Sequence, residues 1–229
     1  LCGNQRGRMT NFWSVELLLS RGYAVVSFND DDLYRGREPE SPDLHSALLE
    51  SSIEKAGGTD AAWGTISAWG WGYSRVIDYL VNLDEIDTER IAVIGHSRRG
   101  KSAFLAGAFD DRIAVTVAHQ GGTGAEALNR RSVFQEPVFI MNHYFPTWFN
   151  SVYKTFNFKI RQLPVDQHQL MSLFAPRALL VTAARDYPWA GSKSSFRAMK
   201  AINPVYELYG SQGVIGSKPL SPKNLNAPI

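Results

Sequence analysis

The serine at position 97 lies in a run whose residue types could form a nucleophile. The run Gly95-His96-Ser97-Arg98-Arg99-Gly100 follows an apolar, mostly β-branched segment at 91–94 and precedes a helix-favouring segment at 101–109. This order predicts a buried strand, a sharp turn and a helix, with the serine hydroxyl at the apex of the turn. Backbone N–H groups at the start of the helix would then face the group that the serine attacks.

The same run departs at one place from the usual G-x-S-x-G pattern of a nucleophile elbow. Position 99 is Arg, and the second glycine falls at position 100. Gly95 and Gly100 flank the expected turn, where a Cβ would clash between strand and helix. An ordinary strand-to-helix turn with a capping serine would explain part of the pattern. Strand, glycine, serine, glycine and helix in register favour the nucleophile elbow of α/β-hydrolases.

A serine nucleophile needs a base that takes its proton and an acid that orients the base. In α/β-hydrolases these residues follow in the order Ser, acid, His. Asp186 comes just after the predicted strand 178–182 and is the candidate acid, although it could also be a surface aspartate paired with Arg185. Gln120 follows the predicted strand 113–118, and its uncharged amide cannot serve as an anionic orienting group.

The histidines do not complete this order. The chain contains His45, His96, His119, His143 and His168, and all of them precede Asp186. His96 is poorly placed to act on its own neighbour Ser97, and we interpret His119, His143 and His168 as binding or structural residues. We therefore expect the catalytic histidine to lie beyond Ile229. The expected unit is a single catalytic domain, residues 1–229, that is incomplete at both termini.

Predicted strands alternate with predicted helices along the chain. The strands are expected at 23–28, 91–94, 113–118, 178–182 and 205–209. The helices are expected at 11–19, in the second half of 62–83, and at 101–109, 167–174 and 192–201. Residues 36–60 form a long excursion, and residues 123–165 show no regular period. This alternation predicts an α/β-hydrolase fold, a mostly parallel, doubly wound sheet with flanking helices in three αβα layers.

Composition excludes several classes of protein. The chain has 229 residues, 44% hydrophobic, which suffices for one α/β domain with a full core. A net charge of +2 indicates neither a nucleic-acid nor a membrane partner, and no apolar run is long enough for a transmembrane helix. The single cysteine, Cys2, excludes an internal disulfide. The aspartates at 30–32 could hold a cation, but we interpret them as a solvated loop, so no metal is expected.

The elbow run resembles the G-C/H-S-R-x-G-K motif of glucuronoyl esterases, carbohydrate esterase family 15. Further segments in the same order resemble other motifs of that family. They are Leu1-Cys2-Gly3-Asn4, Phe145-Pro146-Thr147-Trp148-Phe149, Leu163-Pro164-Val165-Asp166-Gln167-His168 and Leu173-Phe174-Ala175-Pro176-Arg177. Together these matches reach from residue 1 to about residue 209.

The resemblance implies roles for individual positions. Ser97 matches the family's nucleophile, and Arg98 matches an arginine that helps to stabilise the oxyanion beside a backbone N–H. Lys101 matches a lysine that binds sugar hydroxyls. Glu136 resembles the glutamate that holds hydroxyls of the glucuronoyl ring, and Trp189 matches a tryptophan that contacts the sugar.

The acid is the position at which family members differ. Gln120 stands where fungal members carry their catalytic glutamate. This chain therefore resembles members whose acid follows the later strand, with Asp186 as the candidate. Asp186 lies three residues before Trp189, where two would be expected in many members.

The resemblance implies a serine esterase that cleaves the ester between (4-O-methyl-)glucuronic acid of glucuronoxylan and lignin alcohols. It implies no cofactor, no metal, a carbohydrate substrate, a monomer and a secreted or periplasmic location. One alternative is another serine hydrolase, such as an acetyl xylan esterase or a peptidase. A second is a non-catalytic carbohydrate-binding relative that lacks the catalytic histidine. Arg98, Lys101 and Glu136 favour a polar uronate ring over an acetyl group.

Overall fold

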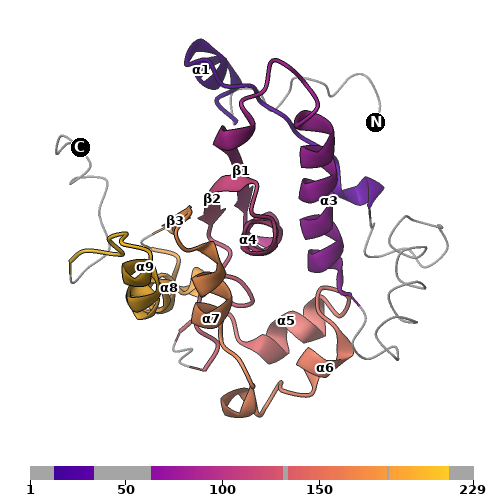
Figure 1. Ribbon diagram of the computed structural model, residues 1–229. Coiled ribbons are helices and arrows are strands. Elements are labelled where there is room, and N and C mark those ends of the chain that lie inside the picture. Colours follow the sequence, from indigo (N-terminus) through magenta and orange to yellow (C-terminus); the bar gives the residue numbers. More distant parts are fainter. Residues whose placement is uncertain (1–12, 34–62, 131–133, 185, 217–229) are drawn as a thin grey trace.

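The computed structural model describes residues 13–33, 63–130, 134–184 and 186–216 (Figure 1). At its centre, three parallel strands form one sheet in the order β1-β2-β3. They are β1 Ile91–His96, β2 Ile113–His119 and β3 Ala178–Thr182. The register pairs His96 with His119 and His119 with Thr182, so the carboxyl ends of the strands meet at one edge. Parallel strands with helices between them confirm the predicted α/β class.

Helices pack against one face of the sheet. Helix α3, Thr65–Leu80, packs on α4, Arg98–Phe109, and α4 packs on β1 and β2 (Figure 1). One apolar cluster joins these elements: Ile77, Ile91, Val93, Ala103, Ala106 and Ile113. A second cluster joins α4 to α7, Gln167–Met171, and α8, Ser192–Ala201, and includes Phe104, Ala118, Met171, Phe174 and Ala198. Helix α4 therefore contributes to both parts of the core.

The opposite face of the sheet is open over the described residues. Side chains of β1 alternate between buried and exposed, and Ile94 is 56% exposed. Leu180 of β3 is 52% exposed. The described part of the chain thus forms two layers, and the second helical layer of the expected αβα arrangement is not found within it.

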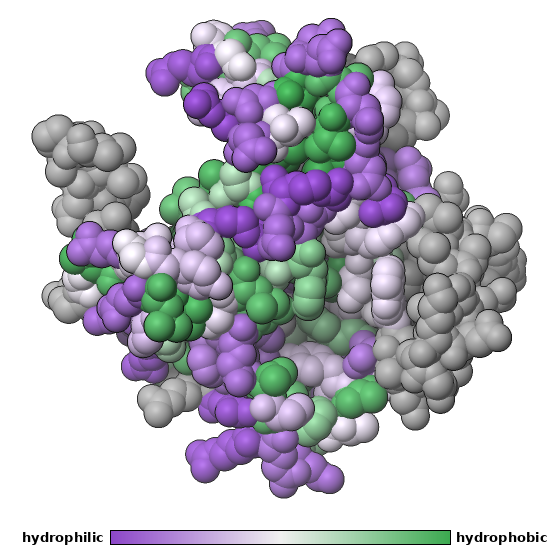
Figure 2. Space-filling view, in the orientation of Figure 1, coloured by the Kyte–Doolittle hydropathy of each residue, from purple (hydrophilic) through white to green (hydrophobic). Residues whose placement is uncertain are grey.

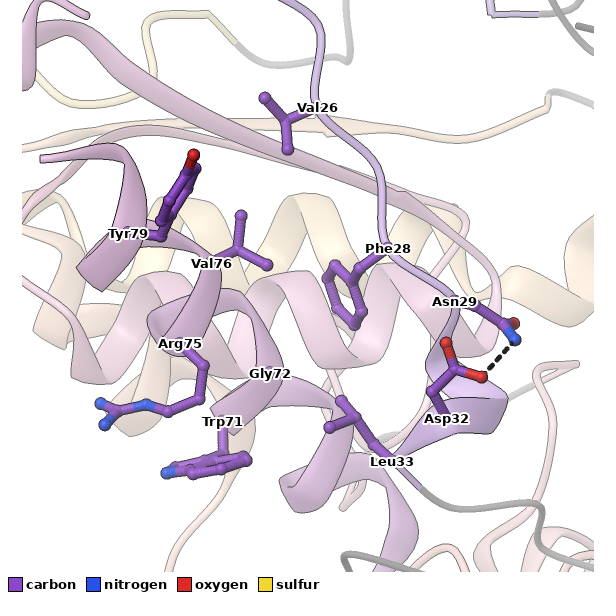
Figure 3. Close-up of a pocket in the computed structure, with 10 residues that line it drawn as sticks. All are labelled: Val26, Phe28, Asn29, Asp32, Leu33, Trp71, Gly72, Arg75, Val76 and Tyr79. Carbon is purple, nitrogen blue, oxygen red and sulfur yellow. Dashed lines mark hydrogen bonds between the residues drawn. The ribbon is translucent and has the colours of Figure 1, made fainter. Parts of the chain in front are cut away.

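The predicted strand at 23–28 is not a strand of the structure. These residues run extended after α1, Val15–Ser20, but pair with no strand among the described residues. Phe28 instead packs edge-on against Tyr73 of α3, with ring centroids 5.1 Å apart. Figure 3 shows Phe28 and Leu33 facing α3, where they help to line a pocket of about 450 Å³. A β-branched run forms a strand only where another backbone offers hydrogen-bond partners.

The predicted strand at 205–209 is wrong, because this segment forms helix α9, Asn203–Leu208. Pro204 is the second residue of the helix, in the first turn, where the N–H groups have no partner within the helix and a missing one costs nothing. Gly210 ends it with φ 69, donating to Glu207 O, while the N–H of Ser211 donates to Tyr206 O. This is a Schellman ending. The proline and glycine on either side are therefore stronger signals than the β-favouring residue types Val and Tyr within the segment.

Residues 123–165 contain short helices that the sequence reasoning did not predict. They are α5 Val138–Tyr144, α6 Ser151–Lys154 and the 3₁₀ turn Ile160–Gln162. Helices of so few residues complete only one or two turns, so they carry no clear hydrophobic period. Helix α1 begins at Val15, later than the predicted start at 11. The predictions for residues 1–5, 36–60 and 221–229 lie outside the described residues.

Two further observations concern classes considered from the sequence. Within the described residues, none of the helices has the length and apolarity needed to cross a membrane. The described part of the chain also contains no cluster of three or more His, Cys, Asp or Glu side chains that could hold a metal ion. Asp30–Asp32 form a 3₁₀ turn, and Asp30 is buried against Arg99, with Oδ1 2.8 Å from Nη2.

Candidate active site

Ser97 occupies the sharp turn between β1 and α4 that the sequence predicts. Its backbone has φ 57 and ψ −124, a conformation that L-residues rarely adopt, and its side chain is exposed. The strand and helix lie so close together that a Cβ on Gly95 would stand 2.0 Å from the carbonyl oxygen of Arg99. A strained serine between a buried strand and a helix N-terminus is the geometry of a nucleophile elbow.

Hydrogen bonds continue the strand ladder beyond the end of the sheet. The N–H of Ser97 donates to His119 O over 2.9 Å, and the N–H of Gln120 donates to Thr182 O over 2.8 Å. Gln120 has φ 53, and residues 120–123 leave the sheet there as a tight segment that we call the 120–123 turn. Ser97 and Gln120 therefore lie one strand apart at the carboxyl edge, where open α/β sheets bind their ligands.

Arg98 and Asp186 belong to the same edge. Arg98 is the first residue of α4, and Asp186 follows the end of β3. Both side chains are exposed, and neither forms an ion pair with another described residue. Because β2 lies between β1 and β3, the elbow and the start of the loop that carries Asp186 are separated by about 10 Å across the sheet. An imidazole between Ser97 and Asp186 would need to span that separation.

The described histidines do not form a triad with Ser97. His119 Nδ1 lies 2.8 Å from Thr182 Oγ1, and its ring centroid lies 4.9 Å from that of His96. Burial, reinforced by the neighbouring His96, lowers the pKa of His119. His143 is exposed on α5, and His168 lies on α7. Within the described residues, the Ser97 hydroxyl makes no hydrogen bond to a histidine.

Lys101 is buried one turn into α4, directly beneath the 120–123 turn. Its Nζ donates to Gly121 O and to Thr123 O, each over 2.6 Å, and to Glu136 Oε2 over 3.4 Å. Burial lowers the pKa of Lys101, and the carboxylate of Glu136 opposes that change. An ammonium group has three N–H donors, so these acceptors use all of them. Binding a sugar hydroxyl at Nζ would require one of these bonds to be exchanged.

Glu136 and Trp189 are brought together by their backbones. The N–H of Glu136 donates to Trp189 O over 3.0 Å, and Thr123 Oγ1 donates to Glu136 O over 2.6 Å. Trp189 lies in the 3₁₀ turn Pro188–Ala190 and is 41% exposed. An exposed indole suits the C–H face of a sugar ring, and a carboxylate suits the hydroxyls at the rim of the ring.

A recess of about 310 Å³ lies near Lys101, on the far side of the Trp148 ring. Its walls include Leu105 of α4, Trp148 and Tyr153 of α6. The Lys101 Nζ lies 5.8 Å from the centroid of the Trp148 ring. Figure 2 shows a hollow on this face beside the lower end of α3. Trp148 therefore separates the buried ammonium from the recess.

Comparison with known proteins identifies the family. The family model described as "Glucuronyl esterase, fungi" matches residues 9–210. The chain belongs to the glucuronoyl esterase family. The resemblance found in the sequence is thereby confirmed, and so is the α/β-hydrolase fold, because the chain is similar to solved structures of glucuronoyl esterases.

The similar glucuronoyl esterases include bacterial and fungal proteins. Carbohydrate esterase MZ0003, from an unknown prokaryotic organism, is 36% identical over 96% of this chain and 50% of its own length. The 4-O-methyl-glucuronoyl methylesterase 1 of Wolfiporia cocos is 34% identical over 82% of this chain and 47% of its own length. The solved structure of a promiscuous CE15 esterase from a marine bacterial metagenome superposes with a TM-score of 0.85, at 33% identity, over 95% of this chain and 54% of that chain. The chain therefore spans about half the length of the curated relatives that it matches.

Sequence reasoning missed a buried acid in this glucuronoyl esterase site. Glu126 is fully buried beneath the 120–123 turn, and its Oε1 accepts the N–H of Gly122 over 2.9 Å. The sequence gives no sign of this burial, because a lone glutamate among the small residues Gly124, Ala125 and Ala127 would ordinarily lie at the surface. Gln135 supports the same region, with Nε2 donating to Thr123 Oγ1 over 2.9 Å.

Proposed function

We propose that the protein is a serine carboxylester hydrolase that cleaves esters of (4-O-methyl-)glucuronic acid, such as those between glucuronoxylan and lignin alcohols. The observation that carries the proposal is the backbone of Ser97, held at φ 57 between β1 and the N-terminus of α4. The curated relatives named 4-O-methyl-glucuronoyl methylesterases support the choice of substrate. The geometry of the elbow and the membership of the glucuronoyl esterase family together favour attack by Ser97 on the carbonyl of a uronate ester.

In this proposal Ser97 Oγ attacks the ester carbonyl while a histidine takes its proton. Asp186 orients that histidine from the end of β3. The developing oxyanion is stabilised by backbone N–H groups at the start of α4 and by the guanidinium of Arg98. The alcohol leaves, and water then hydrolyses the glucuronoyl–serine ester. Serine esterase chemistry of this kind requires no metal or organic cofactor.

The uronate ring would lie over the side chains that surround the 120–123 turn. Trp189 offers its exposed face to the ring, and Glu136 accepts hydrogen bonds from ring hydroxyls. Lys101 contributes a positive charge beneath the ring, and Gln120 borders it at the end of β2. Since the polymers concerned lie outside cells, we propose a secreted or periplasmic enzyme that acts as a monomer through one catalytic domain.

A second candidate function is a serine esterase of broader specificity. The observation that favours it is the similarity of this chain to the marine metagenomic CE15 esterase, a protein described as promiscuous. The exposed position of Ser97 is compatible with small acyl groups as well as with a uronate.

The test compares two substrates with the protein that carries this chain. Hydrolysis of benzyl glucuronate, followed by release of the free acid, should exceed hydrolysis of 4-nitrophenyl acetate in kcat/KM. Equal rates would favour the broader esterase. Binding of glucuronate without turnover of either ester would replace the proposal by a carbohydrate-binding protein.

A further inference from the structure

Glu126 is a buried acid to which the proposed reaction gives no role. Its side chain is inaccessible to solvent, and Oε2 has no hydrogen-bond partner within the described residues. Burial raises the pKa of this carboxyl to about 7, although the backbone N–H of Gly122 and the charge of Lys101 oppose the shift. Keeping such a group buried costs stability, since its ionised form loses hydration.

Glu126 and Lys101 hold opposite sides of the same peptide segment. Glu126 accepts the N–H of Gly122, whereas Lys101 donates to the carbonyl groups of Gly121 and Thr123 on either side of it. The charged groups around the carboxyl are Lys101 of α4 and Glu136, which precedes α5 and bonds to the same ammonium. The N–H and the C=O groups of the turn's backbone thus each bond to a buried side chain.

The turn is in direct contact with the elbow. A Cβ on Gly100 would stand 3.0 Å from His119 O and 3.4 Å from the Cα of Gly121. The helix N-terminus therefore packs on the backbone of residues 119–121 without an intervening side chain. Glu126 leaves equally little room, because a Cβ on Gly121 would stand 2.4 Å from Oε2. A displacement of the turn cannot be absorbed by side-chain rotation and must reach the elbow.

We propose that Glu126 is a positioning residue, whose carboxyl holds the 120–123 turn, together with Lys101, in the one arrangement that supports Ser97. The catalytic consequence rests on the proposed function, whereas the structural consequence does not. The carboxyl touches no reacting atom, so it acts through the Gly122 N–H and the packing of Gly121 on α4.

The test uses Glu126→Gln, which keeps an acceptor for Gly122 but removes the ionisable group, and Glu126→Ala, which removes both. Thr116→Val is the matched control, since Thr116 is a buried residue of β2 whose hydroxyl has no hydrogen-bond partner in the described part of the chain. Amide ¹H–¹⁵N spectra from pH 5 to 9 should show the Gly122 resonance titrating near pH 7 in the parent protein and not in Glu126→Gln. The Ser97 amide resonance should shift in Glu126→Gln and stay in place in Thr116→Val.

Thermal unfolding and kinetics separate positioning from simple support of the fold. Because folding raises the pKa of Glu126 from 4.5 to about 7, its contribution to stability is full below about pH 4.5 and is lost as the pH rises towards 7. Glu126→Gln should remove this loss, so its melting temperature at pH 8 should equal or exceed that of the parent. Its kcat on benzyl glucuronate and on 4-nitrophenyl acetate should nevertheless fall roughly 10-fold.

The outcomes distinguish this inference from the proposed function. An unchanged Ser97 amide and unchanged kcat in Glu126→Gln would overturn the positioning role. Equal losses of melting temperature and kcat would also overturn it, in favour of a role in folding alone. If the parent protein hydrolyses neither ester, the proposed function fails, and the shift of the Ser97 amide still decides whether Glu126 positions the elbow.

Discussion

Two segments follow predicted strands and are held in very different ways. The 120–123 turn follows β2 and is bonded by Lys101 and Glu126 from below and by Gln135 from the side. The segment 29–33 follows the extended residues 23–28 and is anchored to the elbow helix by the ion pair of Asp30 with Arg99, whose side chain is 44% exposed.

The difference shows which of the two segments the fold holds in a single conformation. The backbone N–H and C=O groups of the 120–123 turn bond to buried side chains. Breaking any of these hydrogen bonds would leave a polar group buried without a partner, so the turn is held in one conformation. Asp30 is buried, but the guanidinium of Arg99 is partly exposed, and we expect a pair with one solvated partner to contribute no more than about 1 kcal/mol and to be screened by salt. We therefore expect substitutions near the turn to affect chemistry or folding strongly, and substitutions in 29–33 to have small effects.

The largest expected effect is that of Ser97→Ala, which removes the proposed nucleophile. Loss of a triad nucleophile can reduce kcat by roughly 10⁶-fold. The fold should remain intact, as judged by circular dichroism and melting temperature. Ser20→Ala is the matched control in the N-terminal region, where the hydroxyl donates to Leu17 O at the surface. Substantial turnover in Ser97→Ala would remove the chemistry from the elbow.

Asp186→Asn should reduce kcat by about 10⁴-fold if Asp186 orients the catalytic histidine. Gln120→Glu should restore part of the loss, because it places a carboxylate at the end of the neighbouring strand. Asp111→Asn is a suitable control, since Asp111 is an exposed aspartate that pairs with Arg177 over 3.3 Å. Full activity of Asp186→Asn would assign the acid to another residue.

Two glycine substitutions, one at the elbow and one in the N-terminal segment, compare these regions by the loss in the free energy of unfolding. Gly95→Ala should cost about 3 kcal/mol or prevent folding, because its Cβ would meet backbone atoms that cannot rotate away. In Gly22→Ala the new Cβ would have none of the described atoms within 4 Å, and the substitution should cost about 1 kcal/mol from its φ of 82. Chemical denaturation measures both. Equal costs at the two positions would contradict the contrast between the rigid elbow and the N-terminal segment.

Substitutions of the two partners of the buried ion pair should separate recognition from support. Glu136→Ala removes an acceptor for sugar hydroxyls and should raise KM for benzyl glucuronate by about 10-fold to 100-fold, the equivalent of 1.5–3 kcal/mol. It should change little for 4-nitrophenyl acetate. Lys101→Met also releases the carbonyls of Gly121 and Thr123, so it should impair both substrates. A loss confined to the glucuronate in Lys101→Met would make this lysine a sugar ligand instead of a support.

The smallest expected effect is that of Asp30→Asn, which removes the charge opposite Arg99. We expect a loss of about 0.5–1 kcal/mol in the free energy of unfolding, further reduced by salt. The kcat should stay within about twofold of the parent value. A loss comparable to that of Gly95→Ala would show that 29–33 is held as firmly as the turn.

The sequence reasoning was most successful where short-range signals agreed. The predicted strand, glycine, serine and helix around Ser97 agree with the structure to within three residues, because propensity and steric fit act between neighbours in the chain. The strand prediction fails at 205–209, where Pro204 and Gly210 outweigh the β-favouring residue types, and at 23–28, where a strand-like run pairs with no strand among the described residues. The catalytic and substrate-binding roles stay predictions for all the site residues: Ser97, Arg98, Lys101, Gln120, Glu136, Asp186 and Trp189.

By itself, the sequence determined the α/β class, the elbow and the family, because each depends on residue types at fixed spacing. Only the tertiary structure decided where Lys101 and Glu126 lie and which backbone groups they bond. A lysine one turn into a helix and a glutamate among small residues would ordinarily be assigned to solvent. Both are buried because segments far apart in the chain close over them, and burial turns their charges towards the backbone of the 120–123 turn. Long-range packing determines which polar groups lose water, and no local pattern of residues records that outcome.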